Sequence, residues 1–102
     1  MTNQDLYDRI TEHWLERPGI TTKKMFASIG LAAANGKVFA MLCRDELVVK
    51  IPAHRVDQLE AAGTGSRFHS GPNRPMREWA TVAAPDPATW QALVTEAYDL
   101  VS

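Results

Sequence analysis

The chain has 102 residues, of which 45% are hydrophobic and 23% are charged. This composition is typical of an ordinary soluble globular protein, and the length fits a single domain spanning residues 1–102. The formal net charge of −1 favours no class of partner by itself. A lone cysteine, Cys43, excludes an intramolecular disulfide and a multi-cysteine zinc site.

No segment of the sequence predicts a membrane span or a signal peptide. Apolar runs such as Val38–Cys43 are far shorter than the ~20 residues that a spanning helix needs. Residues 1–5 contain neither a basic stretch nor an apolar one. We therefore expect a cytoplasmic protein that does not contact membranes.

The first segment predicts an amphipathic helix. Its apolar residues recur every four positions, at Leu6, Ile10 and Trp14. Thr2 or Asn3 can cap the start of this helix, and Pro18-Gly19 ends it.

The next segment, residues 22–51, predicts a meander of three antiparallel strands. Asn35-Gly36 is typical of a two-residue type I′ turn and separates Ile29–Ala34 from Lys37–Cys43. A second turn at residues 44–46 leads into Leu47–Ile51, and Lys23–Phe26 leads into the first strand.

The second half of the chain predicts two helices around a short strand pair. The expected elements are a helix at Ala53–Ala62 ended by Gly63, a loop at Gly63–Pro75 with a short strand near Arg67-Phe68, a strand at Glu78–Val82, and a helix that begins at Asp86-Pro87. Because the strands cluster in hairpins, the sequence predicts a two-layer α+β domain with an antiparallel sheet.

The strand at Val38–Cys43 is apolar on both of its faces. Simple alternation places Val38, Ala40 and Leu42 on one face and Phe39, Met41 and Cys43 on the other. One layer of helices covers only one face of a sheet. The other face needs a cover, which is the last helix, the Gly63–Pro75 loop, or a second copy of the chain in a homodimer.

The residues that usually carry chemistry form no catalytic or metal-binding pattern. His13, His54 and His69 lack the spacing of metal ligands. Cys43 ends an apolar strand, where a cysteine behaves as a small hydrophobic residue. We therefore expect no catalytic residue, no metal and no cofactor.

Charge is distributed unevenly along the chain. Residues 17–77 hold ten basic groups and four acidic ones, whereas the segments on either side are acidic. Five basic side chains in this middle segment could contact a phosphate backbone: Lys23, Lys24, Arg67, Arg74 and Arg77. The alternative is that the acidic terminal helices neutralise the basic segment internally.

An ordered series of motifs resembles the TfoX N-terminal domain family (TfoX/Sxy). The series is Lys24-Met25-Phe26, Gly30, Asn35-Gly36-Lys37-Val38-Phe39-Ala40, Leu47-Val48-Val49-Lys50, Ala61-Ala62-Gly63, Phe68, Arg74-Pro75-Met76-Arg77-Glu78-Trp79, and a closing helix with Trp90 and Ala97. The resemblance covers Thr22 to about Tyr98. One departure is Ala27-Ser28, where the family commonly has glycines.

The resemblance implies a fold like that of type III secretion chaperones, with the order α-β(3)-α-β(2)-α. Founding members of the family are bacterial regulators of natural competence that act with a transcription activator and carry a second, C-terminal domain. This sequence ends at Ser102, so we expect a single-domain member and do not carry the competence role over.

Three functional hypotheses follow. The first is a small, non-enzymatic regulatory or protein-interaction domain with an unidentified protein partner. The second is a weak nucleic-acid-binding accessory that uses Lys23, Lys24, Arg74 and Arg77. The third is a small-ligand binder or enzyme with a pocket under the Gly63–Pro75 loop and Trp79 as its wall. We expect Trp79 to be largely buried.

Overall fold

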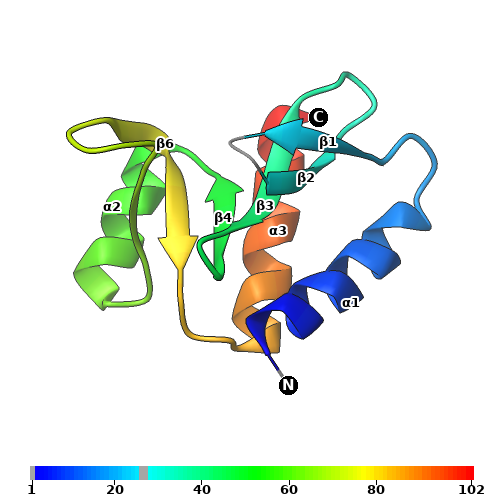
Figure 1. Cartoon of the computed structure of the whole chain (residues 1–102). Coiled ribbons are helices and arrows are strands. Elements are labelled where there is room, and N and C mark those ends of the chain that lie inside the picture. The colour runs from blue at the N-terminus through cyan, green and yellow to red at the C-terminus, as the bar shows by residue number, and fades with distance from the viewer. Residues whose placement is uncertain (1, 26–27) are drawn as a thin grey trace.

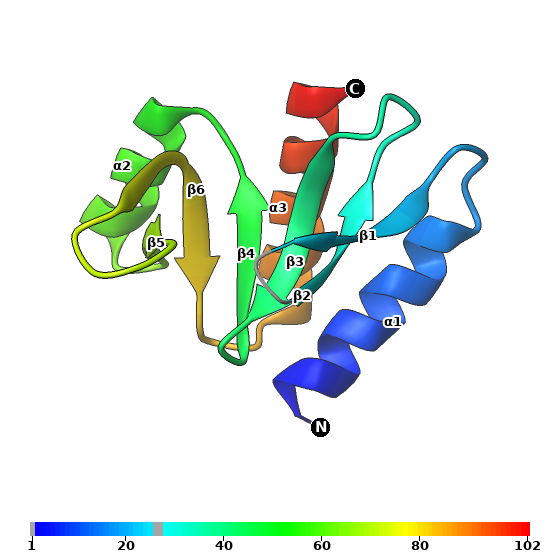
Figure 2. The same ribbon diagram turned by 45° about the horizontal axis from the view of Figure 1, so that its top comes forward.

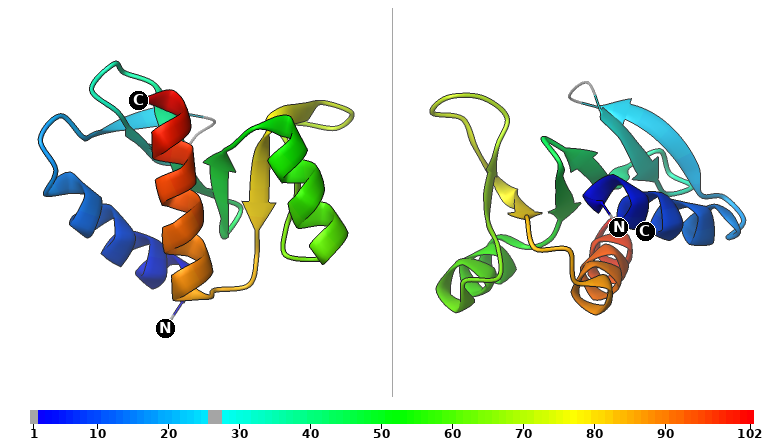
Figure 3. Two further views of the ribbon diagram at one scale, coloured as in Figure 1. Left: turned by 180° about the vertical axis from the view of Figure 1, so that it is seen from behind. Right: turned by 60° about the horizontal axis from the view of Figure 1, so that its bottom comes forward.

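The computed structural model describes residues 2–25 and 28–102, which form an antiparallel six-stranded sheet and three helices (Figure 1). The elements in chain order are α1 (Asn3–Leu15), β1 (Thr21–Met25), β2 (Ser28–Ala32), β3 (Val38–Cys43), β4 (Glu46–Lys50), α2 (Ala53–Ala62), β5 (Ser66–His69), β6 (Pro75–Val82) and α3 (Pro87–Val101). The strand order across the sheet is β1-β2-β3-β4-β6-β5. All three helices lie against the same side of the sheet (Figure 3). The predicted two-layer α+β fold is therefore confirmed.

The helices begin and end where the sequence predicts. Thr2 caps α1, accepting a hydrogen bond from the Asp5 amide, and Asp86 caps α3 in the same way through the Ala88 amide. Gly63 ends α2 in the left-handed conformation, with a φ of 74°.

The meander has four strands rather than the three predicted. β1 is a strand in its own right and pairs with β2 in the register Lys23↔Gly30. Its first four residues are polar and exposed. A polar edge strand shows no apolar alternation, so the pattern indicated only a lead-in segment. Phe26 and Ala27 lie outside the described residues.

The tight turn between β2 and β3 differs from the predicted type. Asn35 is not at positive φ; the Gly36 amide donates to the Ala33 carbonyl, and the Ala33 amide donates to the Lys37 carbonyl. This is a three-residue loop with Gly36 in the left-handed region, so the predicted type I′ turn is wrong. Both central residues of the next turn, Arg44 and Asp45, have positive φ, as type I′ geometry requires.

A β-bulge in β3 changes which side chains share a face. Leu31 pairs with Ala40 but Ala32 pairs with Val38, so β3 holds one extra residue, Phe39. Phe39 and Ala40 therefore both join the core under the helices, while Val38 joins Met41 and Cys43 on the opposite face. The predicted alternation fails at this bulge.

The second face of the sheet is covered from within the chain. Met41 and Val48 on this face have no exposed surface. Their cluster is completed by residues from the outer hairpins: Met25, Phe68, Met76 and Trp79. Figure 2 shows β3 and β4 at the centre, with β1 and β2 on one side and β5 and β6 on the other. The buried residues of α3 pack on the helix-facing side, so the last helix is not the cover.

Candidate functional site

A hollow lined by four lysines lies at one end of the sheet. Its volume is about 570 Å³, and its lining comes from β1, the β2–β3 turn, the start of β3, the end of β4, β6 and the C-terminal end of α3. We call it the lysine hollow after Lys23, Lys24, Lys37 and Lys50. Its apolar lining residues are Met25, Val38, Trp79, Leu100 and Val101.

Strand pairing brings these residues together from distant parts of the sequence. The β1–β2 hairpin carries Lys23 to the β2–β3 turn, where its Nζ donates a hydrogen bond to the Gly36 carbonyl over 3.1 Å. The β4–β6 pairing sets Lys50 directly opposite Trp79. The Lys50 Nζ lies 5.8 Å from the centroid of the Trp79 ring, within reach of a cation–π contact.

The positive charge of the hollow exceeds its negative charge, because four lysines and one glutamate line it. Over the part of the chain that the structure describes, none of its four lysines has an ion-pair partner within 4.0 Å. Glu78 is the acidic residue among those that line it. An anionic group entering the hollow would therefore meet ammonium groups that are free to bind it.

Other basic residues of the middle segment are already paired. Arg55 on α2 donates to Glu96 on α3 at 2.8 Å, and this hydrogen bond raises the pKa of the Arg55 guanidinium above its ordinary value. Arg67 donates to Asp57 at 3.0 Å and lies 3.7 Å from Glu60. Internal neutralisation by a terminal helix is therefore correct for Arg55 but does not extend to the lysines.

The structure separates the residues that the sequence grouped as an interaction surface. Lys23, Lys24 and Trp79 line the lysine hollow, whereas Arg74 and Arg77 are exposed but are not part of its lining. Arg67 is held by α2 carboxylates and is not available for a phosphate backbone.

Two members of the hollow were not among the predicted site residues. Lys37 directly follows the Asn35-Gly36 turn, and Lys50 ends the strand that precedes Pro52. Each is an isolated lysine at the end of an apolar strand. Only the pairing of strands shows that these strand ends lie close together. Sequence analysis missed the two lysines because it does not give the register of the sheet.

Trp79 is 6% exposed, which confirms that it is largely buried. A separate hollow does lie beside Gly63–Ser66, but Trp79 is not among its lining residues. Trp79 therefore belongs to the lining of the lysine hollow rather than to that of the hollow beside this loop.

No three His, Cys, Asp or Glu side chains among residues 2–25 and 28–102 come together as a metal-binding group. No helix in this part of the chain combines the length and the apolar character needed to cross a membrane.

The fold and the hollow define a class of protein: a helix-first α+β domain that presents a basic, partly apolar concave surface. The chain belongs to the TfoX N-terminal domain family, whose sequence model matches residues 12–100. The match runs from the second half of α1 to the end of α3 and includes all four lysines of the hollow. Membership supports a small regulatory or interaction domain. No curated protein and no solved structure matches the chain.

Proposed function

We propose that this chain is a small, non-catalytic, cytoplasmic interaction domain that binds an acidic segment of a partner protein in the lysine hollow. The observation that carries the proposal is the set of four lysines without ion-pair partners among the described residues, beside Trp79 and Leu100. Leu100 is 41% exposed, so an apolar side chain of a ligand can contact it in the hollow.

A protein partner fits these features better than a nucleic acid. Nucleic-acid-binding domains usually spread their basic residues along a stripe or a whole face. Here the free lysines surround one hollow with apolar walls, while Arg67 is paired and Arg74 and Arg77 lie outside it. An acidic segment that also carries an apolar side chain matches both parts of the lining.

The composition of the lining also supports a non-catalytic role. Its ionisable residues are the four lysines and Glu78, and no histidine, cysteine or serine is among the described residues that line it. The described lining therefore contains no Ser–His or Cys–His pair in which a base could activate a hydroxyl or thiol nucleophile.

An NMR titration of the ¹⁵N-labelled protein tests the proposal with two probes, an acidic leucine-containing peptide and a DNA duplex of equal charge. The peptide should shift the Trp79 indole signal and the amides of Lys24 and Lys37. Trp90, which is buried in the core under the helices, provides an internal reference that should not move. Peptide binding should weaken less steeply with salt than any binding of the duplex.

Two double variants, each lacking two positive charges, distinguish binding in the lysine hollow from a general effect of net charge. Lys24→Gln with Lys37→Gln should abolish the peptide-induced shifts, whereas Arg74→Gln with Arg77→Gln should leave them unchanged. All four side chains are exposed, so both variants should fold. The proposal fails if only the duplex shifts the signals of the hollow. It also fails if the arginine variant loses the peptide-induced shifts to the same extent as the lysine variant.

A further inference from the structure

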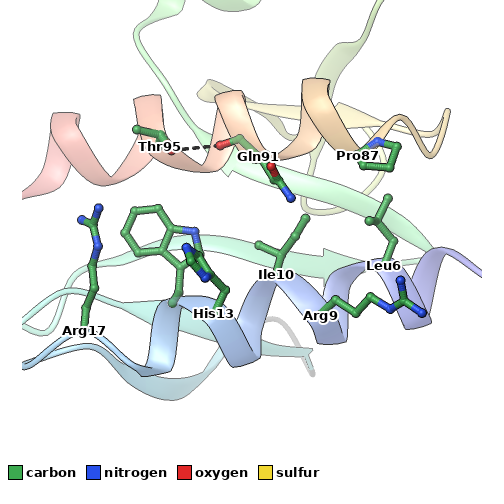
Figure 4. Close-up of a pocket in the computed structure, with 9 residues that line it drawn as sticks. Leu6, Arg9, Ile10, His13, Arg17, Pro87, Gln91 and Thr95 are labelled. Carbon is green, nitrogen blue, oxygen red and sulfur yellow. Dashed lines mark hydrogen bonds between the residues drawn. The ribbon is translucent and has the colours of Figure 1, made fainter.

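A second concave site lies between α1 and α3 and shares no lining residue with the lysine hollow. Its volume is about 420 Å³, and Figure 4 shows the side chains of the two helices facing one another across it. Three buried residues of α1, spaced four apart, belong to its lining: Leu6, Ile10 and Trp14. Pro87, Gln91 and Thr95 line the α3 side with the same spacing. We call this site the α1–α3 groove.

All the ionisable side chains that line the α1–α3 groove are basic residues. Arg9 and His13, four residues apart, lie on one side of α1, and Arg17 lies just beyond the C-terminal end of this helix. No aspartate or glutamate is among the described lining residues. Glu16 approaches His13 at 3.9 Å, but both of these side chains are largely exposed.

Arg17 is held in place at one end of the groove without a carboxylate partner. Its Cζ lies 4.4 Å from the centroid of the Trp14 ring and 5.3 Å from that of Tyr98. Stacking on aromatic faces orients a guanidinium while leaving its in-plane N–H donors free. Within residues 2–25 and 28–102, the Arg17 side chain makes no hydrogen bond and no ion pair.

We propose that the α1–α3 groove binds a small organic carboxylate with an aryl or alkyl body. The Arg17 guanidinium donates to the carboxylate, and the body of the ligand lies against Ile10 and Trp14. The volume is within the range of small-molecule sites, and an apolar floor with a few directed polar groups is their usual composition. A carboxylate matches the charge of the groove, and its planar oxygens suit two parallel N–H donors of an arginine.

A ligand panel read by NMR tests this site with pairs of compounds of the same shape. Each aryl or alkyl carboxylate is compared with its neutral carboxamide at millimolar concentration. The carboxylates should shift the Trp14 indole signal and the amides of Gln91 and Thr95. The matching carboxamides should bind at least about tenfold more weakly, because they lose the charge-assisted hydrogen bonds.

Three variants test whether the preference for the carboxylate over the carboxamide depends on Arg17. They also show whether this preference is independent of the proposed function of the lysine hollow. Arg17→Gln should remove the discrimination between acid and amide, Arg17→Lys should retain part of it, and Lys24→Gln with Lys37→Gln should leave it intact. Unchanged dispersion of the Trp90 signal shows that each variant is folded. The proposal is overturned if no carboxylate shifts the groove signals, if acid and amide bind equally, or if Arg17→Gln keeps the preference.

Discussion

Trp79 serves both the buried cluster on the second face of the sheet and the wall of the lysine hollow. Because it is 6% exposed, Trp79→Ala should leave a cavity and lower the free energy of unfolding by about 3–5 kcal/mol. Arg77→Ala, at an exposed position two residues earlier in β6, should change it by less than about 0.5 kcal/mol. Urea unfolding measures both, and an unchanged midpoint for Trp79→Ala would refute the assignment of this ring to the core.

Tyr7 is a second residue whose environment predicts a measurable property. Burial raises the pKa of Tyr7 to about 12, and its hydroxyl donates to the Ile29 carbonyl at 3.2 Å, with the Ala40 carbonyl 3.4 Å away. In the unfolded chain a tyrosine ionises near pH ~10. The unfolded state therefore loses this proton first, so the stability that the neutral phenol contributes is complete below about pH 10 and falls as the pH rises towards about 12.

Comparison with Tyr7→Phe isolates this effect from the lysines that titrate in the same range. The free energy of unfolding of the wild type, minus that of Tyr7→Phe, should fall by up to about 2–3 kcal/mol between pH ~9 and ~12. Denaturant unfolding at several pH values gives the difference. A difference that stays constant over this range would show that Tyr7 ionises as freely in the folded protein as in the unfolded chain.

The β3–β4 turn illustrates how local geometry sets stability at the scale of an element. Asp45 holds a φ of 64°, which glycine adopts without the steric penalty that other residues carry. Asp45→Gly should therefore raise the free energy of unfolding by about 0.5–1 kcal/mol. Ala34→Gly, in the neighbouring loop at a position that is not at positive φ, should lower it by a similar amount. Thermal unfolding of both variants measures these changes in the free energy of unfolding. Changes of the same sign in the two variants would contradict the assigned turn types.

Periodicity predicted the helices and the central strands because their buried residues repeat at the spacing of one face. Leu6, Ile10 and Trp14 of α1 show this directly. The same reasoning missed β1, whose exposed polar residues carry no such signal, and failed at Phe39, where the bulge shifts the alternation. A bulge depends on how two strands pair, and one strand's sequence does not contain that information.

The candidate site was predictable to a similar extent. Lys23, Lys24 and Trp79 were identified from motifs, whereas Lys37 and Lys50 joined them only through the register of β1 with β2 and of β4 with β6. The pairing of Arg67 with Asp57 and Glu60 was not predictable, because it depends on how α2 packs beside β5. Long-range pairing therefore decides which charges remain free.

At the scale of the whole molecule, the covered second face bears on self-association. The apolar side chains on both faces of β3 prompted the homodimer hypothesis, but Met41 and Val48 are fully buried by the chain's own hairpins. The sheet therefore needs no second copy as a cover. Light scattering behind size exclusion should give a mass near 11.3 kDa at high micromolar concentration. Twice that mass would show that another surface is shared between copies.

An unbiased peptide selection tests whether the lysine hollow recognises acidic protein segments. A display library of random dodecapeptides is selected on the immobilised wild type and, in parallel, on the protein with Lys24→Gln and Lys37→Gln. Selection on the wild type should enrich peptides with several Asp or Glu residues around an apolar side chain, and selection on the lysine variant should lose this enrichment. Enriched peptides without acidic residues, or equal enrichment on both proteins, would contradict it.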